Sequence, residues 1–149
     1  MDFIGKQPGK TTLTSNGLTT IRGHVIKRPH QIALQTETFS ETYAEMWQRC
    51  TQMANALLDK GFKKPDLAIT YMPNCYQYVE IIVACVMANL PLSLGNYRLT
   101  PEEIIYQINN SGSKIIFTQA EQYEMIKPLL DRLPTVQEVI VNSDEKIEG

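Results

Sequence analysis

Residues 66–94 have the sequence DLAITYMPNCYQYVEIIVACVMANLPLSL, and this stretch decides the fold. Residues 66–71 predict a short strand, after which the Pro-Asn turn at 73–74 leads into a helix. Residues 79–88 of that helix are apolar on nearly every side, so we expect it to be sandwiched between other elements. Residues 92–94 predict a second, very short strand. Strand, helix and strand in this order indicate two parallel strands joined by a right-handed crossover.

A long helix is predicted before this stretch. Thr42 and Glu45 have the spacing of a capping box, in which hydroxyl and carboxylate satisfy free amides of the first helical turn. We expect the helix to end at Gly61, because glycine readily adopts the conformation of a C-terminal cap. Its residues at helical spacing form one apolar stripe: Tyr43, Met46, Trp47, Cys50, Met53, Ala54, Leu57 and Leu58.

The N-terminal part of the chain is predicted to be less regular. Residues 1–20 are rich in Thr and Ser and have no apolar period, which indicates a flexible N-terminal arm. Residues 20–28 predict a short helix that Pro29 ends. Residues 32–42 predict two short strands that form a hairpin.

The C-terminal part continues the alternation of helices and strands. A second capping box, Thr100 to Glu103, starts a helix that ends at residues 109–112. The remaining predictions are a strand at 114–118, a helix at 120–133 kinked or interrupted at Pro128, a strand at 137–141 and a polar tail at 143–149. The chain is therefore predicted to be an α/β protein, with one domain over residues 21–142 whose mostly parallel sheet is flanked by helices.

The composition is typical of one soluble globular domain. The 149 residues are 43% hydrophobic and carry a net charge of -2, which offers no electrostatic footprint for nucleic acid or an anionic membrane. The most apolar stretch, residues 81–88, is far shorter than the roughly 20 residues of a transmembrane helix. The N-terminus lacks the pattern of a signal peptide, so we expect a cytoplasmic protein.

Cysteine and histidine residues do not predict a metal or catalytic site. Cys50, Cys75 and Cys85 lack the paired short spacing of a zinc site and are interpreted as core thiols. His24 and His30 have no carboxylate or cysteine nearby in the sequence. We interpret both as solvated residues of a loop or a helix end.

One segment near the N-terminus resembles a phosphate-binding loop. Residues 5–11 have the sequence GKQPGKT, with three residues between the glycines where the motif needs four. A proline lies inside the loop, and only four residues precede it, too few for the strand that the motif requires. We therefore assign no nucleotide site to this segment.

Two further groups of residues have a structural explanation. Glu102 and Glu103 could be taken for paired acids, but adjacent helical residues point about 100° apart, and Glu103 is explained as a cap. Met46, Trp47 and Met53 could form a ligand-binding patch, but their helical spacing favours core packing.

Asn96, Tyr97 and Arg98 form the most interesting polar cluster. They follow a predicted strand end, where α/β folds tend to bind ligands. A surface turn in which Arg98 pairs locally is the competing interpretation, and we favour it.

Four ordered blocks of the sequence together resemble a known family. They are TYAEM at 42–46, ANALLDKGF at 54–62, MPN at 72–74 and NYRLTPEE at 96–103. In this order and spacing they resemble the first third of the adenylate-forming superfamily. That superfamily includes acyl-CoA synthetases, aryl-CoA ligases, luciferases and peptide-synthetase adenylation domains, and the resemblance extends over residues 20–141.

The resemblance implies an activity for a longer parent enzyme. Such enzymes activate a carboxylic acid with ATP and Mg²⁺, release pyrophosphate, and pass the acyl group to a thiol such as CoA. The family binds phosphate with a Thr-Ser-Gly-Thr-Thr-Gly-X-Pro-Lys-Gly loop, assisted by later acidic and aromatic motifs and by a lysine of a C-terminal domain. None of these motifs occurs in residues 1–149. We therefore assign no catalytic, cofactor-binding or metal residue to this chain.

Three residues depart from the family pattern. Asn89 stands where glycine is common, Gly95 where a bulkier residue is usual, and Tyr97 where proline or tryptophan is frequent. These differences leave the substrate class open, with fatty or aryl acids favoured.

Two hypotheses follow. The first hypothesis is that the chain is the N-terminal portion of an AMP-forming acyl-CoA synthetase and is catalytically silent alone. Its partner would then be the rest of the enzyme, and the enzyme could form homo-oligomers. The second is a naturally short, non-catalytic interaction module. A truncated domain should leave a sheet edge and an apolar face exposed.

Overall fold

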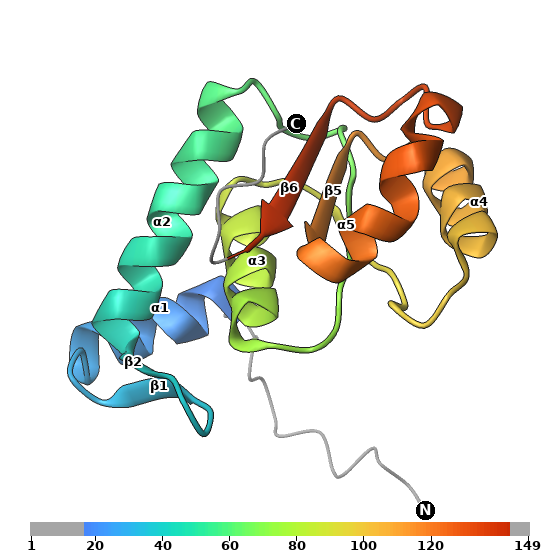
Figure 1. Ribbon diagram of the computed structural model, residues 1–149. Helices are drawn as coiled ribbons and strands as arrows, with labels where there is room; N and C mark the ends of the chain where they lie inside the picture. The colour runs from blue at the N-terminus through green and yellow to red at the C-terminus, as the bar shows by residue number, and fades with distance from the viewer. Residues whose placement is uncertain (1–16, 144–149) are drawn as a thin grey trace, which may run out of the picture.

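The structure is a computed structural model that describes residues 17–143 (Figure 1). It confirms an α/β fold with a parallel four-stranded sheet flanked by helices. The helices are α1 (Gly17–Lys27), α2 (Tyr43–Asp59), α3 (Tyr76–Met87), α4 (Pro101–Ser111), α5 (Ala120–Ile126) and the 3-10 helix η1 (Lys127–Arg132). The strands are β1 (Ile32–Gln35), β2 (Ser40–Thr42), β3 (Ala68–Tyr71), β4 (Leu92–Leu94), β5 (Ile115–Gln119) and β6 (Glu138–Asn142).

The main sheet has the strand order β4-β3-β5-β6, and every pair is parallel. Ile69 of β3 lies opposite Ser93 of β4 on one side and Ile116 of β5 on the other. All four residues of β3 are buried. Burial on both faces explains why buried and exposed residues do not alternate along this strand, as is typical of parallel sheets covered on two sides.

Two apolar clusters cover the two faces of this sheet. Ala68 and Phe117 belong to the first cluster, with residues of α2 and α3. Ile69 and Ile116 belong to the second, with residues of α4 and α5. Successive strand residues therefore point to opposite faces, and Figure 1 shows α2 and α3 on one side of the sheet and α4 and α5 on the other.

The predicted caps of α2 are confirmed. The amide of Thr42 donates to Glu45 Oε2 at 2.8 Å, and the Glu45 amide donates to Thr42 Oγ1 at 3.3 Å. At the other end, Gly61 has a φ of 87°, and its amide donates to the Leu58 carbonyl at 2.9 Å. The Phe62 amide donates to the Leu57 carbonyl at 3.0 Å, which completes a Schellman motif.

Helix α3 ends in the same motif, with Asn89 in the position of the glycine. Asn89 has a φ of 52°, and the following amide, that of Leu90, donates to the Cys85 carbonyl at 2.9 Å. Asparagine tolerates this left-handed conformation better than other residues with a side chain. The expectation that α3 is sandwiched between other elements is wrong in part, since Val79 and Val86 are exposed.

Other predicted elements have clear outcomes. Strands β1 and β2 form the predicted hairpin, with Leu34 opposite Glu41. The predicted helix after β5 is interrupted at Pro128, because α5 ends at Ile126 and a 3-10 segment follows. Helix α1 begins at Gly17, inside the stretch expected to be an arm. Residues 1–16, which include the loop-like segment 5–11, and residues 144–149 lie outside the described part.

Gly95 follows β4 where the chain passes close to β3. A Cβ atom at this position would lie 2.2 Å from the Thr70 carbonyl oxygen. The Gly95 amide donates to Thr70 Oγ1 at 3.2 Å, and that hydroxyl is 3.0 Å from Tyr78 Oη. The departure from the family pattern at residue 95 therefore has a steric cause.

We predict that Gly95→Ala destabilises the chain by about 1 to 3 kcal/mol, because backbone must shift to accommodate the new carbon. Urea unfolding followed by circular dichroism measures this loss. Gly23→Ala is the matched control, since no described atom beyond its chain neighbours and its own helix backbone lies within 4 Å of the added Cβ, and alanine favours a helix. The steric account is wrong if both variants unfold at the same urea concentration as the wild-type chain.

Candidate functional site

The strand order places a candidate site at the carboxyl edge of the sheet. The chain passes from β3 to β4 on one side and then returns to β5 on the other side of β3. The carboxyl ends of β3 and β5 therefore flank the point where the strand order reverses. Open α/β sheets bind ligands at such switch points.

Polar groups at this switch point are hydrogen-bonded to one another. Thr118 Oγ1 donates to the Tyr71 carbonyl at 2.8 Å, and Gln119 Nε2 donates to Cys75 Sγ at 3.5 Å. A cavity of about 300 Å³ lies beside them, at the start of α3. It is lined by Leu34, Gln35, Thr36, Asn74, Cys75, Tyr76 and Val79. These lining residues include no charged side chain that could offset the charge of a triphosphate.

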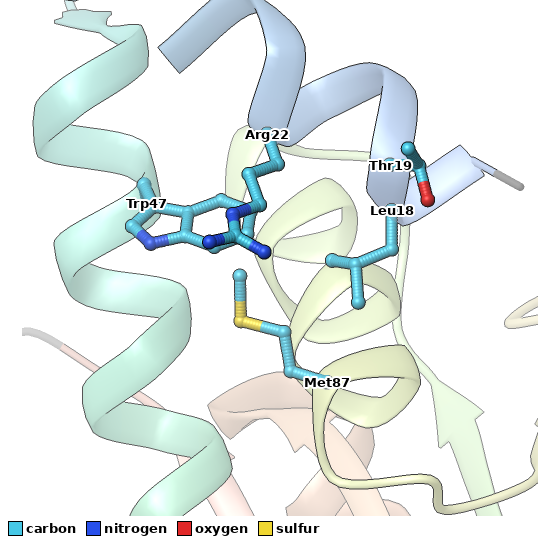
Figure 2. Close-up of a pocket in the computed structure, with 5 residues that line it drawn as sticks. All are labelled: Leu18, Thr19, Arg22, Trp47 and Met87. Carbon is cyan, nitrogen blue, oxygen red and sulfur yellow. The ribbon is translucent and has the colours of Figure 1, made fainter. Parts of the chain in front are cut away.

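A second cavity lies between α1, α2 and α3 and has a volume of about 430 Å³ (Figure 2). Among the described residues, Leu18, Thr19, Arg22, Trp47 and Met87 line it, and Arg22 is the charged one of these five. Core packing is the correct interpretation for Met46 and Met53 but not for Trp47, the third residue of the possible ligand-binding patch. Met46 is buried and Met53 packs against the same core, whereas Trp47 lines this cavity.

The polar cluster at residues 96–98 is an exposed turn after the edge strand β4. The Arg98 amide donates to Asn96 Oδ1 at 3.0 Å, and Arg98 Nε donates to Tyr97 Oη at 3.2 Å. The guanidinium carbon lies 5.5 Å from the Tyr97 ring centre. The structure therefore supports the local pairing of Arg98 that we favoured.

The two adjacent carboxylates of α4 also have structural roles. Glu103 Oε2 accepts from the Thr100 amide at 2.8 Å, which confirms the second capping box. Glu102 accepts from both terminal nitrogens of Arg132, at 2.9 and 2.7 Å. Hydrogen bonding by Arg132 lowers the pKa of Glu102, so this carboxylate is unsuited to act as a general acid near neutral pH.

The thiols are poor nucleophile candidates. Cys50 and Cys85 are buried, and burial raises the pKa of each thiol to about 12. Both are core thiols as predicted, whereas Cys75 is only half-buried.

His24 differs from the expectation of a solvated residue, since its half-buried ring stacks on Tyr43 with ring centres 5.2 Å apart.

The described residues do not fit the ATP and Mg²⁺ that the family resemblance implies. Between residues 17 and 143, no group of three or more His, Cys, Asp or Glu side chains is placed to hold a metal ion. The described residues that line the cavity at the switch point include no charged side chain. In the same part of the chain, no helix has the length and hydropathy of a membrane span.

One cluster of charged residues, built around two buried carboxyl groups, was not predicted from the sequence. Arg49 of α2 donates through Nη2 to Glu80 Oε2 at 3.1 Å and through Nε to Oε1 of the same residue. Glu41 of β2 lies beside this pair, with its Oε2 3.7 Å from Arg49 Nε. The available signal was Glu80 itself, a single charge bordering a helix segment that is otherwise apolar.

We predict that Arg49→Ala destabilises the chain by about 2 to 3 kcal/mol, because it leaves Glu80 buried without a partner. This loss of unfolding free energy is smaller than the loss expected when a fully buried ion pair is broken, because Arg49 is half-exposed. Arg132→Ala, which removes an exposed pair with Glu102, should leave the unfolding midpoint nearly unchanged. Equal losses in the two variants, measured by urea unfolding, would contradict this account.

Comparisons with known proteins agree with the fold and with the sequence blocks. The long-chain-fatty-acid–CoA ligase of Thermus thermophilus is 27% identical over 128 residues, which are 86% of this chain and 23% of the relative. The 4-coumarate–CoA ligase-like 1 of Arabidopsis thaliana is 33% identical over 108 residues, 72% of this chain and 19% of the relative.

A solved structure supports the fold. Coronafacic acid ligase from Pectobacterium brasiliense superposes with a TM-score of 0.83 at 16% identity, covering 88% of this chain and 26% of that protein. This chain thus spans about a quarter or less of the length of these proteins. Residues 21–148 match the family described as AMP-binding enzyme, and the chain belongs to that family.

Proposed function

We propose that this chain is the N-terminal portion of an AMP-forming acyl-CoA synthetase that activates a fatty or aryl carboxylic acid in the cytoplasm. The carrying observation is the match of residues 21–148 to the AMP-binding enzyme family. Relatives named for a long-chain fatty acid and for 4-coumarate support the two substrate classes. The parent enzyme would use ATP, Mg²⁺ and CoA, and the chain alone would be catalytically silent.

The part played by these residues in such an enzyme is structural. Activation of a carboxylate needs cations and amide donors around the phosphates. Glu45 and Glu103 cap helices, and Arg49 and Arg132 form ion pairs. The described residues that line the cavity at the switch point include no charged side chain. The chain would therefore supply a rigid sheet and its covering helices, and other segments would supply the groups that bind phosphate.

Exposed apolar surface favours the portion of an enzyme over the alternative of a self-contained interaction module. Leu94 on the edge strand β4 is 57% exposed, and Tyr106 on α4 is 72% exposed. A cavity of about 460 Å³ lies on α4 between Leu99 and Tyr106. Large exposed apolar side chains on an edge strand and on the neighbouring helix are typical of a surface that another segment covers.

We predict that the chain alone does not catalyse acid-dependent exchange of labelled pyrophosphate into ATP. The assay contains ATP, Mg²⁺ and a panel of fatty and aryl acids, and an intact acyl-CoA synthetase serves as the positive control. Exchange that depends on the added acid would contradict the proposal, because it requires a complete adenylation site within this chain.

A second prediction separates the two hypotheses at the level of the gene. The coding frame is expected to continue past Gly149 and to encode a Gly-, Ser- and Thr-rich phosphate loop within a few tens of residues. Sequencing the locus and the transcript measures this directly. A stop codon at that point would favour the naturally short interaction module.

A further inference from the structure

Two buried carboxyl groups share one arginine where the hairpin meets α2 and α3. Glu41 of β2 is 4% exposed, and Glu80 of α3 is 1% exposed. Arg49 donates two hydrogen bonds to Glu80, whereas its Nε is 3.7 Å from Glu41 Oε2. Among the described residues, both carboxyl oxygens of Glu41 lack a hydrogen-bond donor.

The charges of this cluster do not balance. Two carboxylates and one guanidinium leave an excess negative charge at a buried position. Glu41 cannot reach water to compensate for the missing donors, and a buried carboxylate without donors is costly. Binding one proton neutralises the excess and converts one carboxyl oxygen of Glu41 from an acceptor into a donor.

The neighbouring groups offer no alternative partner. From α2, Arg49 faces Glu41 but is committed to Glu80, and Glu45 adds a negative charge held in the capping box. Cys50, also on α2, stays neutral because burial raises its pKa to about 12. From α3, Glu80 presents a second carboxylate, whose Oε1 accepts from the same Arg49 Nε that lies 3.7 Å from Glu41 Oε2. The residue opposite Glu41 on β1 is the apolar Leu34.

We propose that Glu41 and Glu80 hold one shared proton, and that this proton strengthens the attachment of the β1–β2 hairpin to α2 and α3. With the proton bound, the Glu41 carboxyl donates to the Glu80 carboxylate, which keeps its two bonds from Arg49. Loss of the proton places two carboxylates side by side and loosens the hairpin. The Phe39 and Tyr76 rings, stacked with centres 3.6 Å apart, keep the hairpin tethered in both states.

The direction of the pH effect follows from the surroundings of Glu41. Burial first, and then the charge of Glu80, raise the pKa of Glu41 from 4.5 to about 7, against an opposing effect of Arg49. Between these two values the folded chain binds more protons than the unfolded chain. Stability therefore falls as the pH rises through this window, and the full loss is present above pH 7.

The direct test is a carbon-13 NMR titration of the Glu side-chain carboxyl signals in the wild-type chain. The Glu41 signal is assigned by its absence in Glu41→Gln. We expect its midpoint to lie two or more pH units above 4.5, the ordinary value for a glutamate. A Glu41 midpoint near 4.5 overturns the proposal, and this measurement does not depend on the stability of any variant.

The second test compares urea unfolding of the wild-type chain, Glu41→Gln and the control Glu37→Gln from pH 5 to pH 8. The unfolding constant of the wild type relative to Glu41→Gln should rise roughly a hundredfold across this range. Glu37→Gln should follow the wild type. Hydrogen exchange at the Thr36 amide, which donates to the Phe39 carbonyl, should show the same difference in the hairpin itself. A constant ratio across the pH range refutes the shared proton.

Discussion

All four residues of β3 are buried, and both edges of this strand are hydrogen-bonded, to β4 on one side and to β5 on the other. Backbone amides and carbonyls at such a position have no access to water and need partners from neighbouring strands. Apolar side chains on both faces need a covering layer on each side. The two helical layers, the parallel strand order and the close passage of Gly95 over Thr70 follow from this burial.

Local sequence signals were sufficient to predict most of this architecture. The capping boxes at Thr42 and Thr100 depend on residues three positions apart, and both form as expected. The interruption at Pro128 and the end of α2 at Gly61 also depend on single residues. The fold class followed from the alternation of strands and helices, because that order is typical of a parallel sheet whose strands are joined by crossover helices.

What the sequence could not reveal depends on contacts between distant segments. Arg49 and Glu80 are 31 residues apart, so no short pattern connects them. Val86 is apolar and yet exposed, and its exposure depends on which side of α3 is covered by α2. The need for glycine at position 95 comes from steric contact with the Thr70 carbonyl, which is visible only once the strands are paired. The presence of Asn89 is explained by its left-handed cap conformation, which is visible only once the end of α3 is in place. No catalytic residue was predicted, and the described residues that line the cavity at the switch point include no charged side chain to which a catalytic role could be assigned.

The central claim is that this chain supplies the scaffold of an adenylate-forming enzyme without the groups that hold a triphosphate. Isothermal titration calorimetry of the chain with Mg²⁺-ATP tests it most directly. The account predicts no saturable heat of binding up to millimolar nucleotide. A saturable one-to-one isotherm with a micromolar dissociation constant would contradict it, because that affinity requires a nucleotide site formed by these residues alone.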